Sequence, residues 1–565
     1  MKTYNGDQSP DRSTSLTRRR FLGTGMAAGA ALLTGNPASM FRSPIHTPST
    51  AEPLMEATIP QLQTMMAAKQ LTSRELTLWY LQRIRQLNPL LGAVIETNPN
   101  AVGIAARRDA ERMMGINRGP LHGIPVLVKD NIATDDNMQT TAGSLALVNS
   151  RVPADATVVS RLRAAGAVIL GKANLSEWAN FRGFAPFNGW TARGGFTRNP
   201  YLLDFDPCGS SSGSAVAPAA NLCAAAVGTE TSGSILCPSG NNLIVGIKPT
   251  VGLVSQSGII PITATQDTAG PMCRTVTDAA IMLGAMQSPF GAVAGQNIPS
   301  SYTPFLQPGA LAGKRIGVDK RYFTFDYGGE ADIIEVVNQG LTAMQNLGAT
   351  IVETDTGDIF GWFDYVIEVL HTEFKATIKQ YLAGLSHTSM RSLSDLIAFN
   401  IANCRDEMKY FGQELFEISE ATSGDLSDPA YVTARTLAYQ FAGALGIDKA
   451  MSDDNLDAIV APSYSFASVV AAAAGYPSMS LPLGLSSLGR PSGIWMYAGF
   501  LQESKLISFA YDLEQYLPPR IVPQYIGQVP PEPPDAGICD ALPFARKAYK
   551  GKMRFDPGTG KPFRR

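Results

Sequence analysis

The sequence contains few histidines and few cysteines, which limits the chemistry it can carry. Its 565 residues include six Cys and four His, namely His46, His122, His371 and His387. No CxxC pair and no HExxH segment occurs, so the common zinc sites are not indicated. Six cysteines are too few for a disulfide scaffold, and mechanisms based on histidine have few candidate residues.

Long runs of basic residues are also missing. The formal net charge is -2, the isoelectric point is about 6.2, and Lys and Arg are scattered along the chain. We therefore expect no nucleic-acid partner and no polybasic membrane patch. No apolar run approaches the roughly 20 residues that a transmembrane helix needs, so stable membrane association is not expected. The 45% apolar and 17% charged composition is typical of a soluble globular protein.

The N-terminus resembles an export signal. Thr17-Arg18-Arg19-Arg20-Phe21-Leu22 is a twin-arginine pattern, and a Gly/Ala-rich apolar run follows it at residues 23–35. We expect residues 1–40 to be a Tat-type signal peptide and residues 41–55 a linker. The protein is then periplasmic or secreted.

The folded part begins with alternating helix and strand signals. Residues 72–75 predict a capping box that opens a helix, and residues 93–95, 124–128 and 167–170 are predicted strands. Helices are predicted between these strands at 101–112 and 157–165. This alternation predicts an α/β fold, with a mixed, largely parallel central sheet covered by helices on both faces.

The later part of the chain changes character twice. Residues 280–455 are mainly helical in pattern, and we expect them to form a helical insertion over the site within one large domain of residues 56–515. We expect Trp362, Phe363 and neighbouring aromatics either to line the pocket or, as is commoner for such residues, to pack in the core. Residues 516–565 are Pro-rich and are expected to run extended over the surface.

Two Ser/Gly segments carry the functional signal. They are Cys208-Gly209-Ser210-Ser211-Ser212-Gly213-Ser214 and Gly228-Thr229-Glu230-Thr231-Ser232-Gly233-Ser234-Ile235. Small residues let backbone N–H groups converge on one point, as an oxyanion hole requires. Either segment alone would indicate no more than a flexible Ser-rich loop. Both lie downstream of an apolar strand that ends in Lys129, which makes the combination specific.

Together these segments resemble the amidase signature family. The resemblance begins at Gly123-Ile124-Pro125-Val126-Leu127-Val128-Lys129-Asp130 and Thr140-Thr141-Ala142-Gly143-Ser144, and it includes both Ser/Gly segments. It continues in Val245-Gly246-Ile247-Lys248-Pro249-Thr250, in Asp267-Thr268-Ala269-Gly270-Pro271-Met272, and in shorter motifs up to Glu503. The implied fold is a single amidase signature domain. The implied activity is hydrolysis of carbon-nitrogen bonds in linear amides.

The resemblance also assigns roles to residues. It implies Lys129 as the base, Ser210 as a bridging serine with a cis peptide bond, and Ser234 as the nucleophile. The backbone N–H groups of Thr231, Ser232, Gly233 and Ser234 would form the oxyanion hole. Such chemistry proceeds through an acyl-enzyme, and we expect no cofactor and no metal. A lysine serves as a base near neutral pH only where burial lowers its pKa.

Departures from the family pattern narrow the expected substrate. Cys208 and Ser212 stand at two positions where the family usually has Gly, and Leu236 stands where an Arg usually follows Ser-Ile. The motifs are most similar to those of bacterial peptide amidases, which implies conversion of C-terminal peptide amides to acid and ammonia. Fatty or aryl amides are the alternative substrates within the family. Cys208 and Cys237 lie near the two serines, and we expect two buried thiols, with a disulfide as the alternative.

Two alternatives of another class stay open. Gly209-Ser210-Ser211-Ser212-Gly213 fits the GxSxG nucleophile elbow of α/β-hydrolases, with His371 or His387 as a downstream base. However, residues 203–207 are a poor strand, and an elbow should follow a strand. The second alternative is a non-catalytic or tRNA-amidotransferase-type relative. The complete set of Lys129, Ser210 and Ser234 disfavours a non-catalytic relative, and the export signal disfavours a tRNA-amidotransferase-type relative.

Overall fold

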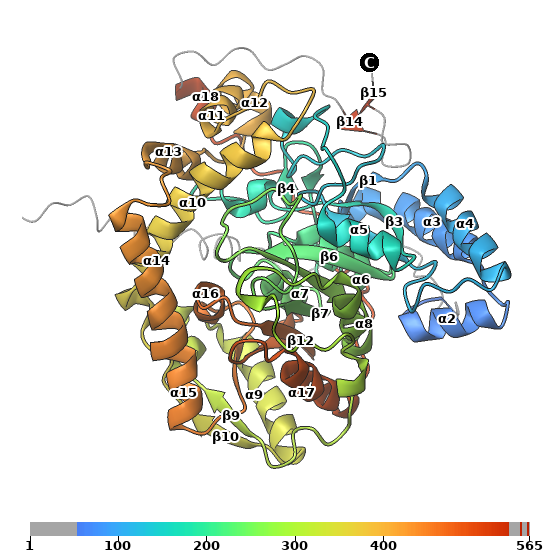
Figure 1. Ribbon diagram of the computed structural model, residues 1–565, viewed down its shortest axis with the longest axis vertical. Coiled ribbons are helices and arrows are strands. Elements are labelled where there is room, and N and C mark those ends of the chain that lie inside the picture. Colours follow the sequence, from blue (N-terminus) through green and yellow to red (C-terminus); the bar gives the residue numbers. More distant parts are fainter. Residues whose placement is uncertain (1–53, 542–553, 556–561, 564–565) are drawn as a thin grey trace, which may run out of the picture.

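Eleven strands form one sheet at the centre of the molecule. The computed structural model describes residues 54–541, 554–555 and 562–563, and in these residues the strand order is β1-β3-β2-β6-β8-β7-β12-β13-β11-β9-β10 (Figure 1). The strands are β1 (Val94–Thr97), β2 (Pro125–Lys129), β3 (Val168–Ala173), β6 (Ala225–Glu230), β7 (Val245–Lys248), β8 (Thr268–Cys273), β9 (Arg315–Val318), β10 (Thr350–Glu353), β11 (Ala458–Pro462), β12 (Ser478–Leu485) and β13 (Pro491–Tyr497). Short pairs also form between β4 (Trp190–Thr191) and β5 (Gly195–Phe196), and between β14 (Arg554–Phe555) and β15 (Pro562–Phe563).

The sheet is mixed, and its strand directions change across it. Strands β3, β2 and β6 run parallel at one side, and β11, β9 and β10 run parallel at the other. The pairs between these two groups, from β6 through β8, β7, β12 and β13 to β11, are antiparallel. Every residue of β2, β3, β6 and β8 is buried. Since successive side chains point to opposite faces, both faces of the sheet are covered, and the predicted α/β fold with a mixed sheet is confirmed. The sheet is less parallel than expected, because six of its ten strand pairs are antiparallel.

The first helices follow the sequence signals closely. The helix α3 (Ser73–Leu91) begins where Thr72 Oγ1 accepts from the Glu75 N–H at 3.1 Å while the Thr72 N–H donates to Glu75 at 2.8 Å. This is the predicted capping box, which satisfies two otherwise unpaired N–H groups. The remaining helices of this part are α2 (Ile59–Ala67), α4 (Ala101–Met113), α5 (Thr157–Ala164), α6 (Ser212–Ala219), α7 (Leu236–Asn241) and α8 (Val276–Met286).

The helical section is shorter than the expected range of 280–455. The strands β9 and β10, with helix α9 (Ala331–Asn346) between them, belong to the central sheet and its covering layer. The continuous helical section consists of α10 (Phe363–Ala383), α11 (Leu393–Ala402), α12 (Cys404–Glu407), α13 (Glu414–Ala421), α14 (Pro429–Ala442) and α15 (Asp448–Asp453). It lies along one side of the sheet, in yellow and orange in Figure 1. The chain then returns through β11, α16 (Ala467–Ala473), β12, β13 and α17 (Glu503–Tyr516).

After α17 the chain runs without helix or long strand as far as α18 (Ile538–Ala541). A disulfide joins Cys539 in α18 to Cys404 in α12. None of the described helices is both long and apolar enough to span a membrane. The expected signal peptide at 1–40, and the expected linker at 41–55 except its last two residues, lie outside the described residues.

Candidate active site

Lys129 ends the buried strand β2 and has no exposed surface. Strand β6 lies parallel beside it, so Lys129 and Thr229 meet at the carboxyl ends of two neighbouring strands. The Lys129 Nζ atom lies 2.8 Å from Ser210 Oγ, 3.0 Å from Ser211 Oγ and 2.9 Å from Thr229 Oγ1. The lysine that the sequence singled out is therefore buried and bonded to one of the two predicted serines.

Burial changes the proton affinity of this lysine. Loss of hydration disfavours the ammonium form and lowers the pKa of Lys129 to about 7, although the nearby carboxylates of Asp267 and Glu230 act in the opposite direction. A substantial fraction of Lys129 is then neutral near pH 7 and able to accept a proton.

Ser210 lies in a tightly held loop before α6. Its peptide bond with Gly209 is cis, as the resemblance implied, and its carbonyl accepts from the Ser176 N–H at 2.9 Å. Helix α6 then packs so closely on the β1 and β3 region that a Cβ on Gly213 would lie 2.3 Å from the Ala93 carbonyl oxygen. Glycine is required there because any side chain would collide with backbone.

The second Ser/Gly segment is folded around the carboxylate of Glu230. This buried group accepts from the N–H groups of Gly233 at 2.8 Å, Ile235 at 2.7 Å and Leu236 at 3.0 Å. Burial raises the pKa of Glu230, while Lys248 nearby lowers it. The resulting turn leaves Ser234 partly exposed and places its carbonyl 3.2 Å from the Ser211 N–H that donates to it.

Three of the four backbone N–H groups predicted for the oxyanion hole remain available to bind an oxyanion. The Gly233 N–H is used by Glu230, whereas no hydrogen bond between described residues uses the N–H groups of Thr231, Ser232 or Ser234. The Thr231 side chain donates to Asp267 at 2.6 Å, which fixes the start of this turn. The sequence did not predict the part played by Glu230, because its position inside the Ser/Gly segment contains no sign of which way its carboxylate points.

A disulfide links the two segments, contrary to the expectation of two buried thiols. Cys208 and Cys237 are bonded, with their Cα atoms 5.9 Å apart. Cys208 comes two residues before Ser210, and Cys237 comes three residues after Ser234. The expectation was wrong because sequence spacing contains no measure of the distance between the two segments, which the contact between Ser211 and Ser234 brings together. The free cysteines among the described residues are Cys223 and Cys273, both buried.

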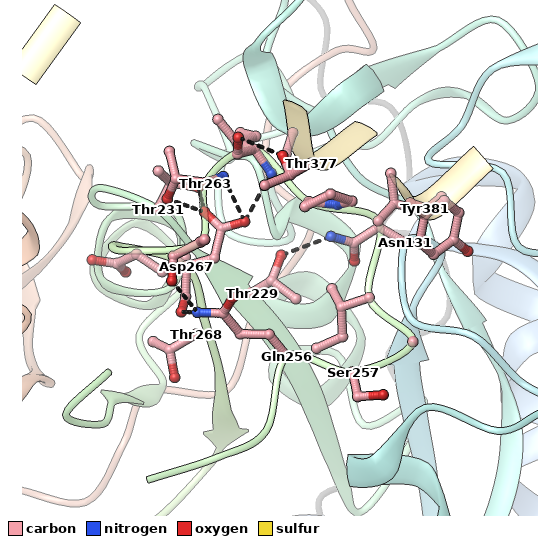
Figure 2. A pocket seen from close by; sticks show the side chains of 18 of the residues that line it. Asn131, Thr229, Thr231, Gln256, Ser257, Thr263, Asp267, Thr268, Thr377 and Tyr381 are labelled. Carbon is pink, nitrogen blue, oxygen red and sulfur yellow. Dashed lines mark hydrogen bonds between the residues drawn. The ribbon is translucent and has the colours of Figure 1, made fainter. Parts of the chain in front are cut away.

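Two cavities flank the second segment. The first, which we call the threonine cavity, measures about 390 Å³ and is shown in Figure 2. Its lining includes Asn131, Thr229, Thr231, Thr263, Asp267, Thr268, Thr377 and Tyr381. The second, the aromatic cavity, measures about 590 Å³ and reaches Cys208, Gly209, Ser232 and Gly233. Its walls include Phe184, Phe187, Phe196, Phe363, Phe466 and Trp495.

Helix α10 lies beside both cavities. Phe363 lines the aromatic cavity and Tyr381, near the other end of the helix, lines the threonine cavity. The helical section thus covers the site, as expected. Trp362 is buried in the core beside this helix and does not line either cavity.

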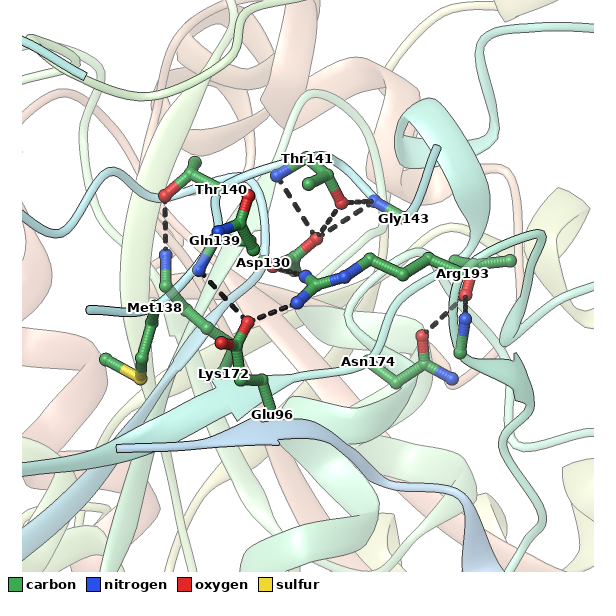
Figure 3. Close-up of polar contacts among 12 residues, drawn as sticks. Glu96, Asp130, Met138, Gln139, Thr140, Thr141, Gly143, Lys172, Asn174 and Arg193 are labelled. Carbon is green, nitrogen blue, oxygen red and sulfur yellow. Dashed lines mark hydrogen bonds and ion pairs between the residues drawn. The ribbon is translucent and has the colours of Figure 1, made fainter. Parts of the chain in front are cut away.

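A buried ionic network supports the strand end that carries Lys129 (Figure 3). Arg193 lies between two carboxylates, 3.0 Å from Asp130 and in an ion pair with Glu96. Asp130 also accepts from Thr141 Oγ1 at 2.6 Å and from the Gly143 N–H at 3.0 Å. No local pattern in the sequence pointed to this network, because its members come from separate segments.

The nucleophile-elbow alternative finds no support in the geometry. Ser211 precedes α6 without a strand directly before it, and its Oγ donates to the Thr229 carbonyl at 3.0 Å. His371 lies in α10 with its Nδ1 2.7 Å from Ser419 Oγ, and burial lowers its pKa to about 4. His371, one of the two candidate bases for Ser211, is thus engaged with a different serine, and the other candidate, His387, is exposed.

Comparison with known proteins identifies the family of this chain. The family model described as Amidase matches residues 75–469. A peptide amidase from Stenotrophomonas maltophilia is similar in structure, with a TM-score of 0.78, 46% sequence identity, and coverage of 83% of this chain and 99% of that chain. A probable amidase of Arabidopsis thaliana is 42% identical over 485 residues, which is 84% of this chain and 92% of the relative. A glutamyl-tRNA(Gln) amidotransferase subunit of Methylobacillus flagellatus is 31% identical over 82% of this chain and 97% of the relative.

The matches to amidases show that the protein is a hydrolase that acts on amide carbon-nitrogen bonds. The chain belongs to the amidase signature family.

Proposed function

We propose that the protein hydrolyses amides with Lys129, Ser210 and Ser234 as its catalytic triad. The observation that carries this proposal is the contact of 2.8 Å between Nζ of a fully buried lysine and Ser210 Oγ. The pKa of Lys129, lowered to about 7, supports its role as a base. The partial exposure of Ser234, next to a fully buried Ser210, supports its role as the nucleophile that substrate reaches.

The proposed reaction moves one proton along this triad. Neutral Lys129 accepts the Ser210 hydroxyl proton while Ser210 accepts that of Ser234, and Ser234 Oγ forms a bond to the amide carbon. The N–H groups of Thr231, Ser232 and Ser234 stabilise the oxyanion. Return of the proton to the leaving nitrogen breaks the carbon-nitrogen bond and leaves an acyl-enzyme. Water then repeats the sequence and releases the acid.

We propose C-terminal peptide amides as the substrates, with ammonia as the leaving group. The 46% identity to a peptide amidase supports this choice, as does an aromatic cavity whose volume of about 590 Å³ lies in the range typical of ligand pockets. Fatty and aryl amides are the second candidate, because the cavity walls are mainly apolar and aromatic.

Single substitutions test the triad. Lys129→Ala, Ser210→Ala and Ser234→Ala should each lower kcat by about 10⁴-fold or more, because the three residues act as one unit. Ser214→Ala is a matched control: Ser214 is fully buried, as Lys129 and Ser210 are, and lies near the start of α6, but its hydroxyl donates to the Val227 carbonyl at 3.1 Å. Its activity should stay within about tenfold of wild type. Full activity of Lys129→Ala together with loss in His371→Ala would refute the triad.

Ammonia release from a panel of amides tests the substrate. We expect the highest kcat/KM for peptide amides, with lower values for fatty and aryl amides of equal purity. A clear preference for fatty or aryl amides would reject the proposal that peptide amides are the substrates, but it would not contradict the proposed triad.

We also propose that the protein is exported by the twin-arginine pathway to the periplasm or beyond. The motif Arg18-Arg19 supports this, and so do two disulfides, because such bonds persist mainly in oxidising compartments. Exchange of both residues for Lys keeps the charge but removes the motif. The variant should stay in the cytosol on cell fractionation, and equal export of variant and wild type would refute the proposal.

A further inference from the structure

The Pro-rich segment after α17 forms part of the wall of the aromatic cavity. Pro530, Pro531 and Pro533 are among the lining residues, together with Phe187 and Phe196. We call residues 517–541 the strap. Its first half lies on the α/β part of the molecule and its last residues lie on the helical section, so the prolines cross the region between them.

The first anchor of the strap is Arg520. This side chain is nearly buried, donates to the Tyr201 hydroxyl at 2.7 Å and forms an ion pair with Glu56. The Tyr201 hydroxyl in turn donates to the Ile521 carbonyl at 2.6 Å. Further along, the Leu203 N–H donates to the Ile526 carbonyl at 2.9 Å. The strap is therefore bonded to the segment that leads into Cys208 and the Ser210 loop.

The second anchor lies around α12. Glu532 accepts from Lys409 Nζ at 3.0 Å and from the Tyr410 hydroxyl at 2.9 Å. Arg405 pairs with Asp540, and the Cys404–Cys539 disulfide fixes α18 beside α12 (Figure 1). A covalent bond and several polar contacts thus hold the strap at the prolines and beyond them.

The prolines share the wall of the cavity with aromatic side chains. Tyr410, which holds Glu532, packs its ring 5.9 Å from Phe187 and 5.4 Å from Phe196, measured between ring centroids. Phe187, Phe196 and the prolines line one cavity with Ser232 and Gly233, which lie in the proposed catalytic turn. A substrate whose amide reaches Ser234 would extend its acyl part toward this rigid, apolar wall.

We propose that the strap is a specificity element, whose prolines bind the part of the acyl chain beyond the residue that carries the scissile amide. This inference rests on the proposed amide hydrolysis. Proline lacks an N–H donor and has a fixed φ, so it offers apolar contact at small cost in conformational entropy. Short substrates, such as amino-acid amides, would not reach the strap, whereas tripeptide amides would.

Kinetics with substrates of graded length test the strap. In Pro530→Gly/Pro533→Gly, we expect kcat/KM for a tripeptide amide to fall about tenfold, mainly through KM, while an amino-acid amide stays within about twofold. The matched control is Pro519→Gly/Pro534→Gly, which loosens exposed prolines of the same strap that do not line the cavity. This control should leave both substrates unchanged.

A second variant removes the covalent anchor without altering the cavity wall. Cys404→Ser/Cys539→Ser should weaken the tripeptide amide selectively, as the proline variant does. The proposal is overturned if both substrates lose activity equally, or if the tripeptide amide is unaffected or improved in both variants.

If the wild-type enzyme releases no ammonia from any peptide amide, the proposed substrate fails instead. The strap is then tested by comparing short and long acyl chains within the class of amide that the enzyme hydrolyses.

Discussion

At the scale of single residues, the proposed mechanism makes activity depend on the protonation state of Lys129. Its pKa is lowered to about 7 by burial, so the protonated form prevails below pH 7 and the neutral base above it. We predict that kcat/KM rises with pH along an acid limb centred near pH 7. The measurement is ammonia release between pH 5 and 9 at substrate concentrations below KM. A limb near the ordinary lysine value, or no limb, would contradict the assignment.

Asp267 offers a direct check of the origin of this limb. Its carboxylate raises the pKa of Lys129, while burial raises its own pKa to about 6. Asp267→Asn removes the negative charge, so the lysine should lose its proton more readily and the limb should move to lower pH by about one unit. Ser214→Ala, away from this charge, should leave the limb in place. A move to higher pH would show that another group titrates.

The resemblance to the amidase signature family assigned Lys129, Ser210 and Ser234, because the family motifs are short, ordered and rich in small residues. It did not predict that the Gly233 N–H is occupied by Glu230, or that Cys208 and Cys237 are bonded. Both depend on how two segments fold against each other. Distances between segments are set by the whole sheet and helix packing, which local patterns do not contain.

At the scale of elements, the Cys208–Cys237 disulfide joins the two loops that carry Ser210 and Ser234. We predict that Cys208→Ser/Cys237→Ser lowers kcat by about 10- to 100-fold, because a small misplacement of reacting groups has a large effect on rate. The assay is ammonia release from an amino-acid amide. Cys404→Ser/Cys539→Ser is the control, since this bond lies between α12 and α18 and should leave kcat for that short substrate intact. Equal kcat in both variants would contradict a positioning role.

The end of β2 depends on the network of Arg193, Asp130 and Glu96 (Figure 3). Arg193→Met leaves two buried carboxylates without their shared cation, and breaking such a buried pair typically costs about 3–5 kcal/mol. We predict a markedly lower Tm in thermal unfolding, with loss of activity.

The control for this network is Arg163, whose side chain pairs with Asp136 and Asp155 at partly exposed positions. Arg163→Met should cost about 1 kcal/mol or less, because solvent screens that pair. Equal shifts in Tm for the two variants would show that burial does not decide the cost.

Elements with strong local signals were predicted well, and those without them were not. The capping box located the start of α3, and the apolar runs located β2 and β3. In contrast, β9 and β10 have only four residues each, and the sequence pattern assigned them wrongly to a helical insertion. Such short strands owe their conformation to neighbours in the sheet, which lie far away in sequence.

At the scale of the whole molecule, the helical section and the α/β part are joined through a second buried cluster. Arg182 pairs with Glu177 and lies 3.6 Å from Glu407 in α12, and its guanidinium lies 3.9 Å from the centre of the Phe411 ring. Glu407 also accepts from the Leu145 N–H at 2.7 Å. The helices that cover the site are thus held to the part that carries the proposed catalytic residues, and α12 holds the strap in addition.

The Cys404–Cys539 disulfide closes a long loop, and loop length makes a ranking testable. Its two cysteines are 135 residues apart, against 29 for Cys208–Cys237. In the chain-entropy model the first bond stabilises by about 5 kcal/mol and the second by about 3.6 kcal/mol. All four cysteines are buried, so the cost of placing serine there is similar in both pairs. We predict that Cys404→Ser/Cys539→Ser lowers the denaturation midpoint more than Cys208→Ser/Cys237→Ser, although only the second pair reduces kcat for a short substrate. The reverse ranking of midpoints would mean that the structure around the serine loops, rather than chain entropy, determines what each disulfide contributes to stability.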